Sequence, residues 1–134
     1  MQYRFLKFIS WVLCLLPHSV LLWLGKILGS LYYQIAAKQR KRAIEQMMKS
    51  LQVPKEKASE ICRDSFINIG RTFLEIMYMP KLNRQNFTDY MEVEHIDRFK
   101  NALAEGNGVV ILTAHVGNWE WLSAALTFSD IPLT

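Results

Sequence analysis

The residues of this chain best placed to do chemistry are a histidine and a glutamate in the segment Thr-Ala-His-Val-Gly-Asn-Trp-Glu-Trp, residues 113–121. On a continuous helix, the offset from His115 to Glu120 would separate the two side chains by about 140°. With a turn between them, both can face one cleft, where Glu120 accepts a hydrogen bond from one imidazole nitrogen. The other nitrogen is then free to act as a general base on an acceptor hydroxyl, which is typically worth about 10²–10⁴ in rate. By spacing alone, a structural histidine beside an unrelated surface glutamate is the commoner explanation.

Neither a metal site nor a cofactor is predicted. His115 and Glu120 together supply fewer ligands than a zinc ion requires. His18 and His95 lie far away in dissimilar contexts, and we expect both to be structural or surface residues. The two cysteines, Cys14 and Cys62, form neither a metal motif nor a disulfide framework, so both are predicted to be reduced packing residues.

The segment around the pair predicts a strand, a turn and a helix. Val109–Thr113 is a short β-branched run, typical of a strand buried on both faces of a parallel sheet. Gly117 permits a turn with positive φ, and Asn118 is a good N-cap for the helix that follows. This order places His115 at the carboxyl end of a strand, where open α/β sheets bind ligands. Glu120 falls in the first helical turn, where the helix dipole favours a carboxylate.

Further elements are predicted before this segment. Residues 42–51 favour a short helix, and a long helix runs from Pro54 to Pro80 with apolar residues at three- and four-residue spacings. Met91–Glu94 alternates apolar and acidic residues and predicts a short strand, and residues 96–105 predict a helix. Because two strands are too few for a buried parallel sheet, we expect the chain to be the amino-terminal part of a longer α/β protein.

Two features of the long predicted helix are specific enough to test. Gly70 lies in its middle, where glycine costs roughly 1 kcal/mol relative to alanine. A close approach of another backbone would explain it. Arg71 and Glu75 are spaced for an ion pair along one face of the helix.

Residues 1–37 predict a membrane-associated helical segment, because residues 8–25 contain no Asp, Glu, Lys or Arg. Three membrane or export arrangements remain open: a transmembrane helix, a shallow hairpin of residues 3–16 and 18–36 in one leaflet, and a secretory signal. The signal is least favoured, because no small-residue cleavage site follows the apolar run. A wholly soluble buried helix pair is the remaining alternative.

A basic cluster follows the apolar segment, and the chain has a net charge of +4. Beside a membrane, each such charge is worth about 1 kcal/mol of attraction to anionic lipid. The positive-inside rule would place this side in the cytoplasm. Nucleic acid is not a predicted partner, because no interleaved aromatic residues are available to stack on bases. The cluster consists of Lys38, Arg40, Lys41 and Arg42.

Nearly the whole chain resembles the lipid A biosynthesis lauroyl/myristoyl acyltransferases, a family within the wider lysophospholipid acyltransferase group. The resemblance rests on the apolar start, the basic stretch, residues 66–70 with Glu75, and above all residues 108–120, Gly-Val-Val-Ile-Leu-Thr-Ala-His-Val-Gly-Asn-Trp-Glu. The full string is far more specific than the spacing of its two reactive residues.

The resemblance implies an α/β fold that is predominantly helical in this part of the protein, with amino-terminal membrane-associated helices over residues 1–37 and an incomplete acyltransferase domain over residues 38–134. It implies that His115 is the general base and Glu120 its orienting carboxylate. We expect Gly117, Asn118 and Trp119 to shape the site. The donor would be an acyl thioester on acyl-carrier protein or coenzyme A, and the acceptor a hydroxyl of a lipid A precursor. The protein would act at the cytoplasmic face of the inner membrane without a metal.

The chain departs from the family in length, because family members are considerably longer and carry later motifs that have no counterpart here. We therefore expect this polypeptide alone to be inactive or nearly so. Two alternatives remain open: a related acyltransferase that uses a lysophospholipid or another glycolipid, and a non-enzymatic membrane-bound helical module.

Overall fold

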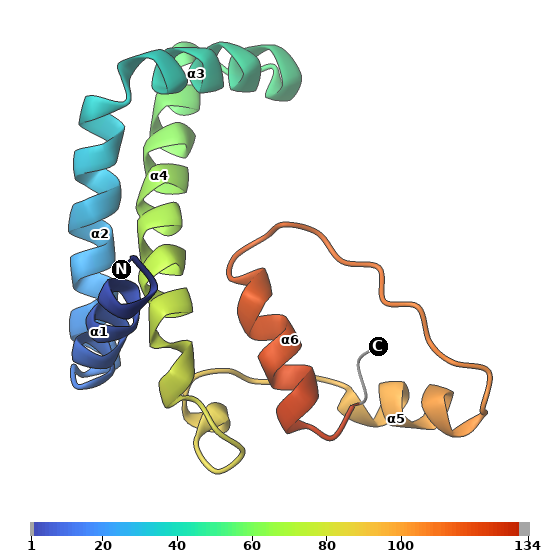
Figure 1. The fold of residues 1–134 in the computed structure, drawn as a ribbon. Helices are drawn as coiled ribbons and strands as arrows, with labels where there is room; N and C mark the ends of the chain where they lie inside the picture. Colours follow the sequence, from blue (N-terminus) through green and yellow to red (C-terminus); the bar gives the residue numbers. More distant parts are fainter. Residues whose placement is uncertain (1, 132–134) are drawn as a thin grey trace. The chain divides into compact units, whose positions relative to one another are not determined.

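The computed structural model describes residues 2–131, which belong to two compact units divided after Tyr78 (Figure 1). The first unit contains four helices. These are α1 (Gln2–Cys14), α2 (His18–Ile35), α3 (Ala37–Leu51) and α4 (Lys55–Tyr78). The second contains two 3₁₀ turns, η1 (Met79–Lys81) and η2 (Phe87–Asp89), and the helices α5 (Ile96–Ala104) and α6 (Trp119–Phe128). The predicted boundary after residue 37 lies at the bend between α2 and α3, inside the first unit.

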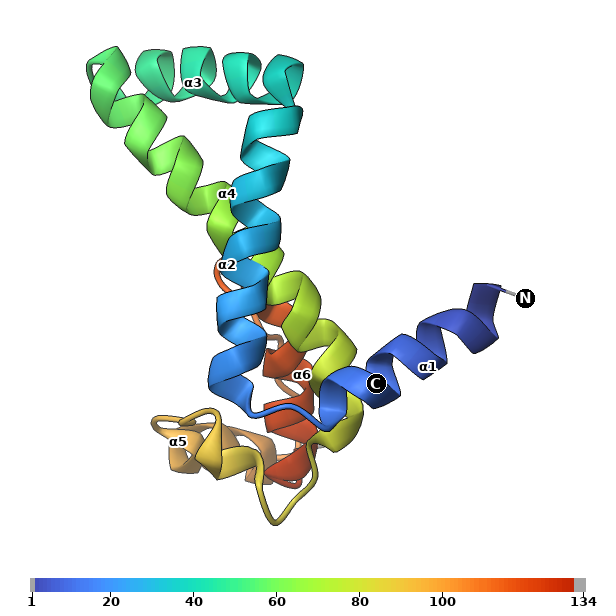
Figure 2. The same ribbon diagram turned by 90° about the vertical axis from the view of Figure 1, so that its left-hand side faces the viewer.

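In the first unit, α2 and α4 lie side by side, and α3 crosses their ends (Figure 2). Prolines set two of the helix starts. Pro17 is the N-cap of α2, with φ −61° and ψ 143°, and Pro54 precedes the first turn of α4. The bend between α2 and α3 is 91°. Within residues 2–131, no single helix meets the length and hydropathy expected of a bilayer span, although the bent pair of α2 and α3 meets them together.

The α2–α4 contact is a close backbone crossing made by three glycines. A Cβ added to Gly25 would lie 2.6 Å from Arg71 Cα, and one added to Gly29 would lie 2.6 Å from Ile67 Cα. A Cβ added to Gly70 would meet the backbones of Gly25 and Gly29. These separations are too short for carbon atoms, so the two backbones touch where side chains would normally keep helices apart. The close approach predicted at Gly70 is confirmed.

Aromatic and aliphatic side chains complete the core at the α3 end of the crossing. Phe66 is buried, and its ring packs against Tyr32 and Tyr33, with centroids 5.2 and 5.6 Å away. Cys62 is also buried, and its loss of solvation raises the pKa of the thiol. Both cysteines are free thiols, as predicted.

The basic cluster is helical, because α3 begins at Ala37 and includes all four cations. The predicted short helix over residues 42–51 therefore starts several residues too late. Arg40 differs from the other three cations in being half-buried. It donates to the carbonyl of Tyr33 at 2.6 Å and lies 5.0 Å above the Tyr33 ring. Arg40 thus satisfies the carboxyl end of α2, where a cation also complements the helix dipole. Lys38, Lys41 and Arg42 remain exposed.

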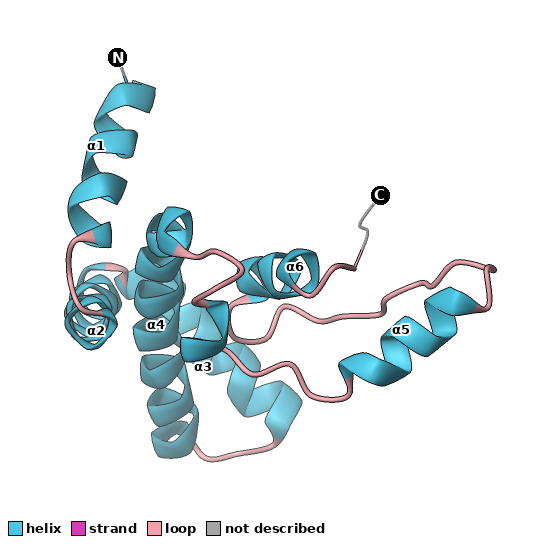
Figure 3. Ribbon diagram, turned by 90° about the horizontal axis from the view of Figure 1, so that it is seen from below, coloured by secondary structure: helices cyan, strands magenta, loops and turns pink. Residues whose placement is uncertain are grey.

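The second unit is built from helices and loops, and the described residues contain no strand (Figure 3). The strands predicted at Met91–Glu94 and Val109–Thr113 are therefore wrong, and the α/β layering is not seen in residues 2–131. Val110 and Leu112 are 96% and 99% exposed. A strand of this kind needs hydrogen-bonded neighbours and covering helices. Without them, its apolar sequence lies open to solvent.

Candidate functional site

The proposed reactive segment connects α5 to α6 as an irregular chain. Gly117 has φ +62°, which confirms the predicted left-handed turn just before α6. The side chain of Asn118 caps the helix, with Oδ1 accepting a hydrogen bond from the Trp121 backbone N–H at 3.3 Å. Glu120 lies in the first turn of α6, as predicted. Gly117 and Asn118 therefore determine the turn and the start of α6 through local interactions.

The Asn118 cap gives a stability prediction. Asn118→Ala removes the acceptor for the Trp121 N–H, and it is expected to destabilise α6 by about 1 kcal/mol. Hydrogen exchange of the α6 amides, followed residue by residue, should become about fivefold faster, which is the factor that corresponds to about 1 kcal/mol. Asn107→Ala, an exposed loop position, is the matched control and should leave these rates unchanged. Equal exchange in the two variants would contradict the capping role.

His115 and Glu120 are both exposed, and no hydrogen bond joins them in the part of the chain that the structure describes. The imidazole of His115 instead packs on Trp119, with ring centroids 4.8 Å apart and planes inclined by 53°. The structure therefore brings the histidine together with a predicted site-shaping residue and places the carboxylate one residue further along the helix. Residues 110–115 are exposed and belong to no helix, so the segment that carries His115 is not part of a packed layer that would hold the imidazole toward Glu120.

A surface groove of about 420 Å³ adjoins the start of α6. Asn118 lies at one part of its lining, and Trp121 and Leu122 contribute apolar surface from α6. Met91 and Val93 supply further apolar lining from the segment before α5. Most of the exposed lining is apolar, although Glu92 and Glu94 also border the groove, so it can receive part of a hydrocarbon chain.

A histidine–glutamate contact is formed in the first unit instead, between residues that lie far apart in the sequence. His18 Nε2 lies 3.2 Å from Glu75 Oε1, and the two side chains are 24% and 16% exposed. The His18 ring also lies 5.7 Å from that of Tyr78, whose hydroxyl donates to the Leu16 carbonyl. This contact fastens the start of α2 to α4, so the structural role expected of His18 is confirmed.

The predicted pairing of Arg71 with Glu75 is wrong. Glu75 turns toward His18, whereas Arg71 Nη1 donates to Asn68 Oδ1 at 3.4 Å. The competing partner comes from a different helix, which the spacing along α4 does not reveal. Within residues 2–131, no three His, Cys, Asp or Glu side chains are close enough to share a metal ion.

Comparison with known proteins supplies the family. Residues 3–130 match the family model described as bacterial lipid A biosynthesis acyltransferase. Searches of curated proteins and of solved structures found no match. The match spans nearly the whole chain, including the reactive segment and the helices before it. The chain therefore belongs to the bacterial lipid A biosynthesis acyltransferase family.

Proposed function

We propose that this chain supplies the general base of an acyltransferase that moves a fatty acyl group from a thioester to a hydroxyl of a lipid A precursor. The observation that carries the proposal is the placement of His115 directly before α6, with Glu120 in the first turn of that helix. The family assignment supports acyl transfer in lipid A biosynthesis, and this placement supports the residue roles.

The proposed chemistry needs only a base and a support for it. A ring nitrogen of His115 takes the proton of the acceptor hydroxyl as its oxygen attacks the thioester carbon. The carbon–sulfur bond then breaks, and the leaving thiolate receives the proton from the imidazolium, which yields an ester and a free thiol. Glu120 orients the imidazole and stabilises its charged form once the hydrogen bond between them is made. Trp119 holds the face of the ring.

The groove beside α6 suggests where the acyl chain lies. Trp121, Leu122 and Val93 give it apolar lining within the same unit as the base. A hydrocarbon chain seated there would gain about 25 cal/mol for each Å² of apolar surface removed from water. The donor would be an acyl group on acyl-carrier protein or coenzyme A, and we propose no metal or cofactor.

Acyl transfer by a chimera tests this function. Residues 3–130 of this chain would replace the matching part of an active, longer family member. We expect the chimera to acylate a lipid A precursor, and the comparison of acyl-carrier-protein with coenzyme A thioesters to identify the donor. Transfer to a lysophospholipid in preference to the lipid A precursor would support the alternative acceptor. A folded chimera with no transfer to any hydroxyl would refute the proposal.

We further propose that the 134-residue chain alone transfers acyl groups far more slowly than the chimera. His115 is exposed, its hydrogen bond to Glu120 is not formed, and the groove beside it is open. A base in water without a positioned acceptor loses most of its advantage in orientation. Equal rates for the two proteins, measured with a radiolabelled acyl donor, would contradict this expectation.

We also propose that α1 and α2 attach the protein to the cytoplasmic face of the inner membrane. Both helices expose large apolar side chains, including Trp11 at 59% and Trp23 at 60%. Tryptophan favours the membrane–water interface, and the exposed cations of α3 suit an anionic leaflet. Residues 5–35 also expose the large apolar side chains of Phe5, Phe8, Leu15, Ile27, Leu31 and Ile35.

Vesicle binding tests the attachment. The double variant Trp11→Ala/Trp23→Ala is expected to bind anionic vesicles at least about tenfold more weakly, because two large apolar side chains no longer enter the bilayer. Phe73→Ala is the matched control, since Phe73 is an equally exposed aromatic residue on α4. It should bind like the parent chain. Equal weakening by both variants would show that α1 and α2 are not the attachment surface.

A further inference from the structure

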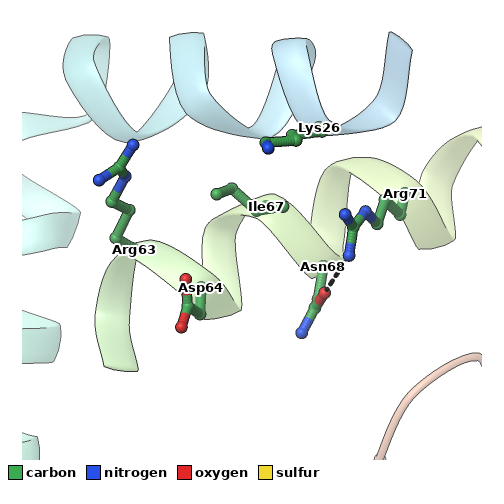
Figure 4. Close-up of a pocket in the computed structure, with 6 residues that line it drawn as sticks. All are labelled: Lys26, Arg63, Asp64, Ile67, Asn68 and Arg71. Atoms are coloured by element: carbon green, nitrogen blue, oxygen red, sulfur yellow. Dashed lines mark hydrogen bonds between the residues drawn. The ribbon is translucent and has the colours of Figure 1, made fainter. Parts of the chain in front are cut away.

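A groove of about 520 Å³ in the first unit lies between α2 and α4, away from the proposed reactive segment. Lys26 enters it from α2, and Arg63 and Arg71 enter it from α4 around Ile67 (Figure 4). Three cations therefore share the lining with a single carboxylate, Asp64, and with the amide of Asn68. The glycine crossing is what brings the cations of two helices so close, because the α2 backbone lies directly against Arg71 at Gly25.

The donors in this groove exceed the acceptors that the chain offers them. Arg71 makes one long hydrogen bond, from Nη1 to Asn68 Oδ1 at 3.4 Å. Its Nε is buried and has no acceptor among the described residues. Within residues 2–131, no ion pair joins Asp64 to Lys26, Arg63 or Arg71. Guanidinium and ammonium groups that line one groove without anionic partners repel one another, and an anion bound in the groove would relieve the repulsion.

We propose that this groove binds a phosphate monoester carried by a membrane lipid. Three cations against one carboxylate leave a surplus of two positive charges, which suits the charge of about −1.5 to −2 on a phosphate monoester at neutral pH. A planar guanidinium fork also matches the spacing of phosphate oxygens better than an ammonium group does. A carboxylate ligand would leave part of the surplus charge uncompensated.

The position of Lys26 on α2 favours a lipid as the source of the phosphate. One turn before it lies Trp23, and next to it lies Ile27, both exposed on the apolar surface proposed to enter the membrane. A helix lying at the interface with Trp23 among the acyl chains would hold Lys26 near the phosphate layer. The lipid source therefore rests on the proposed membrane attachment, whereas the recognition of phosphate rests on the groove alone.

The test compares the binding of the 134-residue chain to phosphatidylcholine vesicles containing either phosphatidic acid, a monoester, or phosphatidylglycerol, a diester. At about 0.15 M salt, where exposed charges are screened, we expect a preference for phosphatidic acid of about fivefold or more. The variant Arg63→Gln/Arg71→Gln should lose this preference while retaining its binding to phosphatidylglycerol vesicles. Lys49→Gln/Lys55→Gln removes the same charge outside the groove and should keep the preference.

Four outcomes would overturn the proposal. Equal loss in the two double variants would mean that overall charge, and no built site, attracts the lipid. If inorganic phosphate bound the parent chain but not the arginine variant, and phosphatidic acid vesicles were not preferred, the groove would bind a free anion and no lipid. If the chain bound no vesicle, both the lipid as the source of the phosphate and the proposed membrane attachment would be refuted. If it bound both kinds of vesicle equally, the membrane attachment would stand and only the proposed phosphate site would be refuted. Lys26→Gln, a change at an exposed position, repeats the test if the arginine variant does not fold.

Discussion

Replacing Gly29 with valine is expected to lower the free energy of unfolding of the first unit by about 3 kcal/mol. Even the first carbon of a side chain at this position would lie 2.6 Å from Ile67 Cα and would also strike the Phe66 carbonyl. The obstruction is backbone, which has no rotamer to escape into. Because Gly70 occupies the opposite side of the contact, α2 and α4 must separate to make room. Urea unfolding followed by far-UV circular dichroism measures the loss.

Gln34→Val is the matched control for this prediction. It introduces the same β-branched side chain into α2 at an exposed position, where valine has a lower helix propensity than the glutamine it replaces. Its expected cost is a few tenths of a kcal/mol. If the two variants unfold at the same urea concentration, the close crossing does not stabilise the unit, and the helices tolerate a wider separation.

Within the active chimera, His115→Ala is expected to reduce acyl transfer by about 10²–10⁴-fold, which is the contribution of a positioned general base. The loss should fall on the rate of the chemical step, because the imidazole acts on the proton of the acceptor hydroxyl as the new bond forms. Glu120→Gln should reduce transfer by at least about 10-fold, since an amide orients the imidazole without stabilising its charge. Single-turnover measurements with a radiolabelled acyl donor would separate this step from binding.

His95→Ala is the control for the histidine variant. His95 is exposed and precedes α5 with φ +55°, so its removal leaves the segment from 113 to 121 untouched. We expect acyl transfer close to that of the parent chimera. A His115→Ala protein that retained near-normal transfer would refute the assigned base, and a double variant no slower than either single variant would indicate that His115 and Glu120 act as one unit.

Features of the fold that depend on neighbouring residues were predictable from the sequence. Among the alternatives for the apolar start, the two segments 3–16 and 18–36 match α1 and α2, and Asn118 caps α6 as its type and position indicate. Gly70 was also informative, because a glycine inside a long helix is costly unless another backbone lies against it. In each case, a local steric or hydrogen-bonding requirement selects a particular residue type, which can be recognised in the sequence.

Features that depend on distant partners were not predictable. Val109–Thr113 has the composition of a buried strand, yet strand structure requires neighbouring strands, which residues 2–131 do not provide. Arg40 was assigned to the membrane surface with its neighbours, but it turns back onto the end of α2. The contact between His18 and Glu75 joins helices far apart in sequence. For the same reason, the candidate base is identified by its sequence string, while its hydrogen bond to Glu120 stays a prediction.

The side chains of a helix usually have to pack against a partner helix and also set the polarity of the exposed surface. The glycine crossing separates these two roles in α2. Because α2 meets α4 through backbone atoms, the identity of its outward side chains contributes little to holding the two helices together. Trp23, Ile27 and Leu31 are therefore expected to tolerate replacement by polar residues without loss of the crossing. The same independence would allow the hydrophobicity of α2 to change without loss of the crossing, as long as the three glycines are kept.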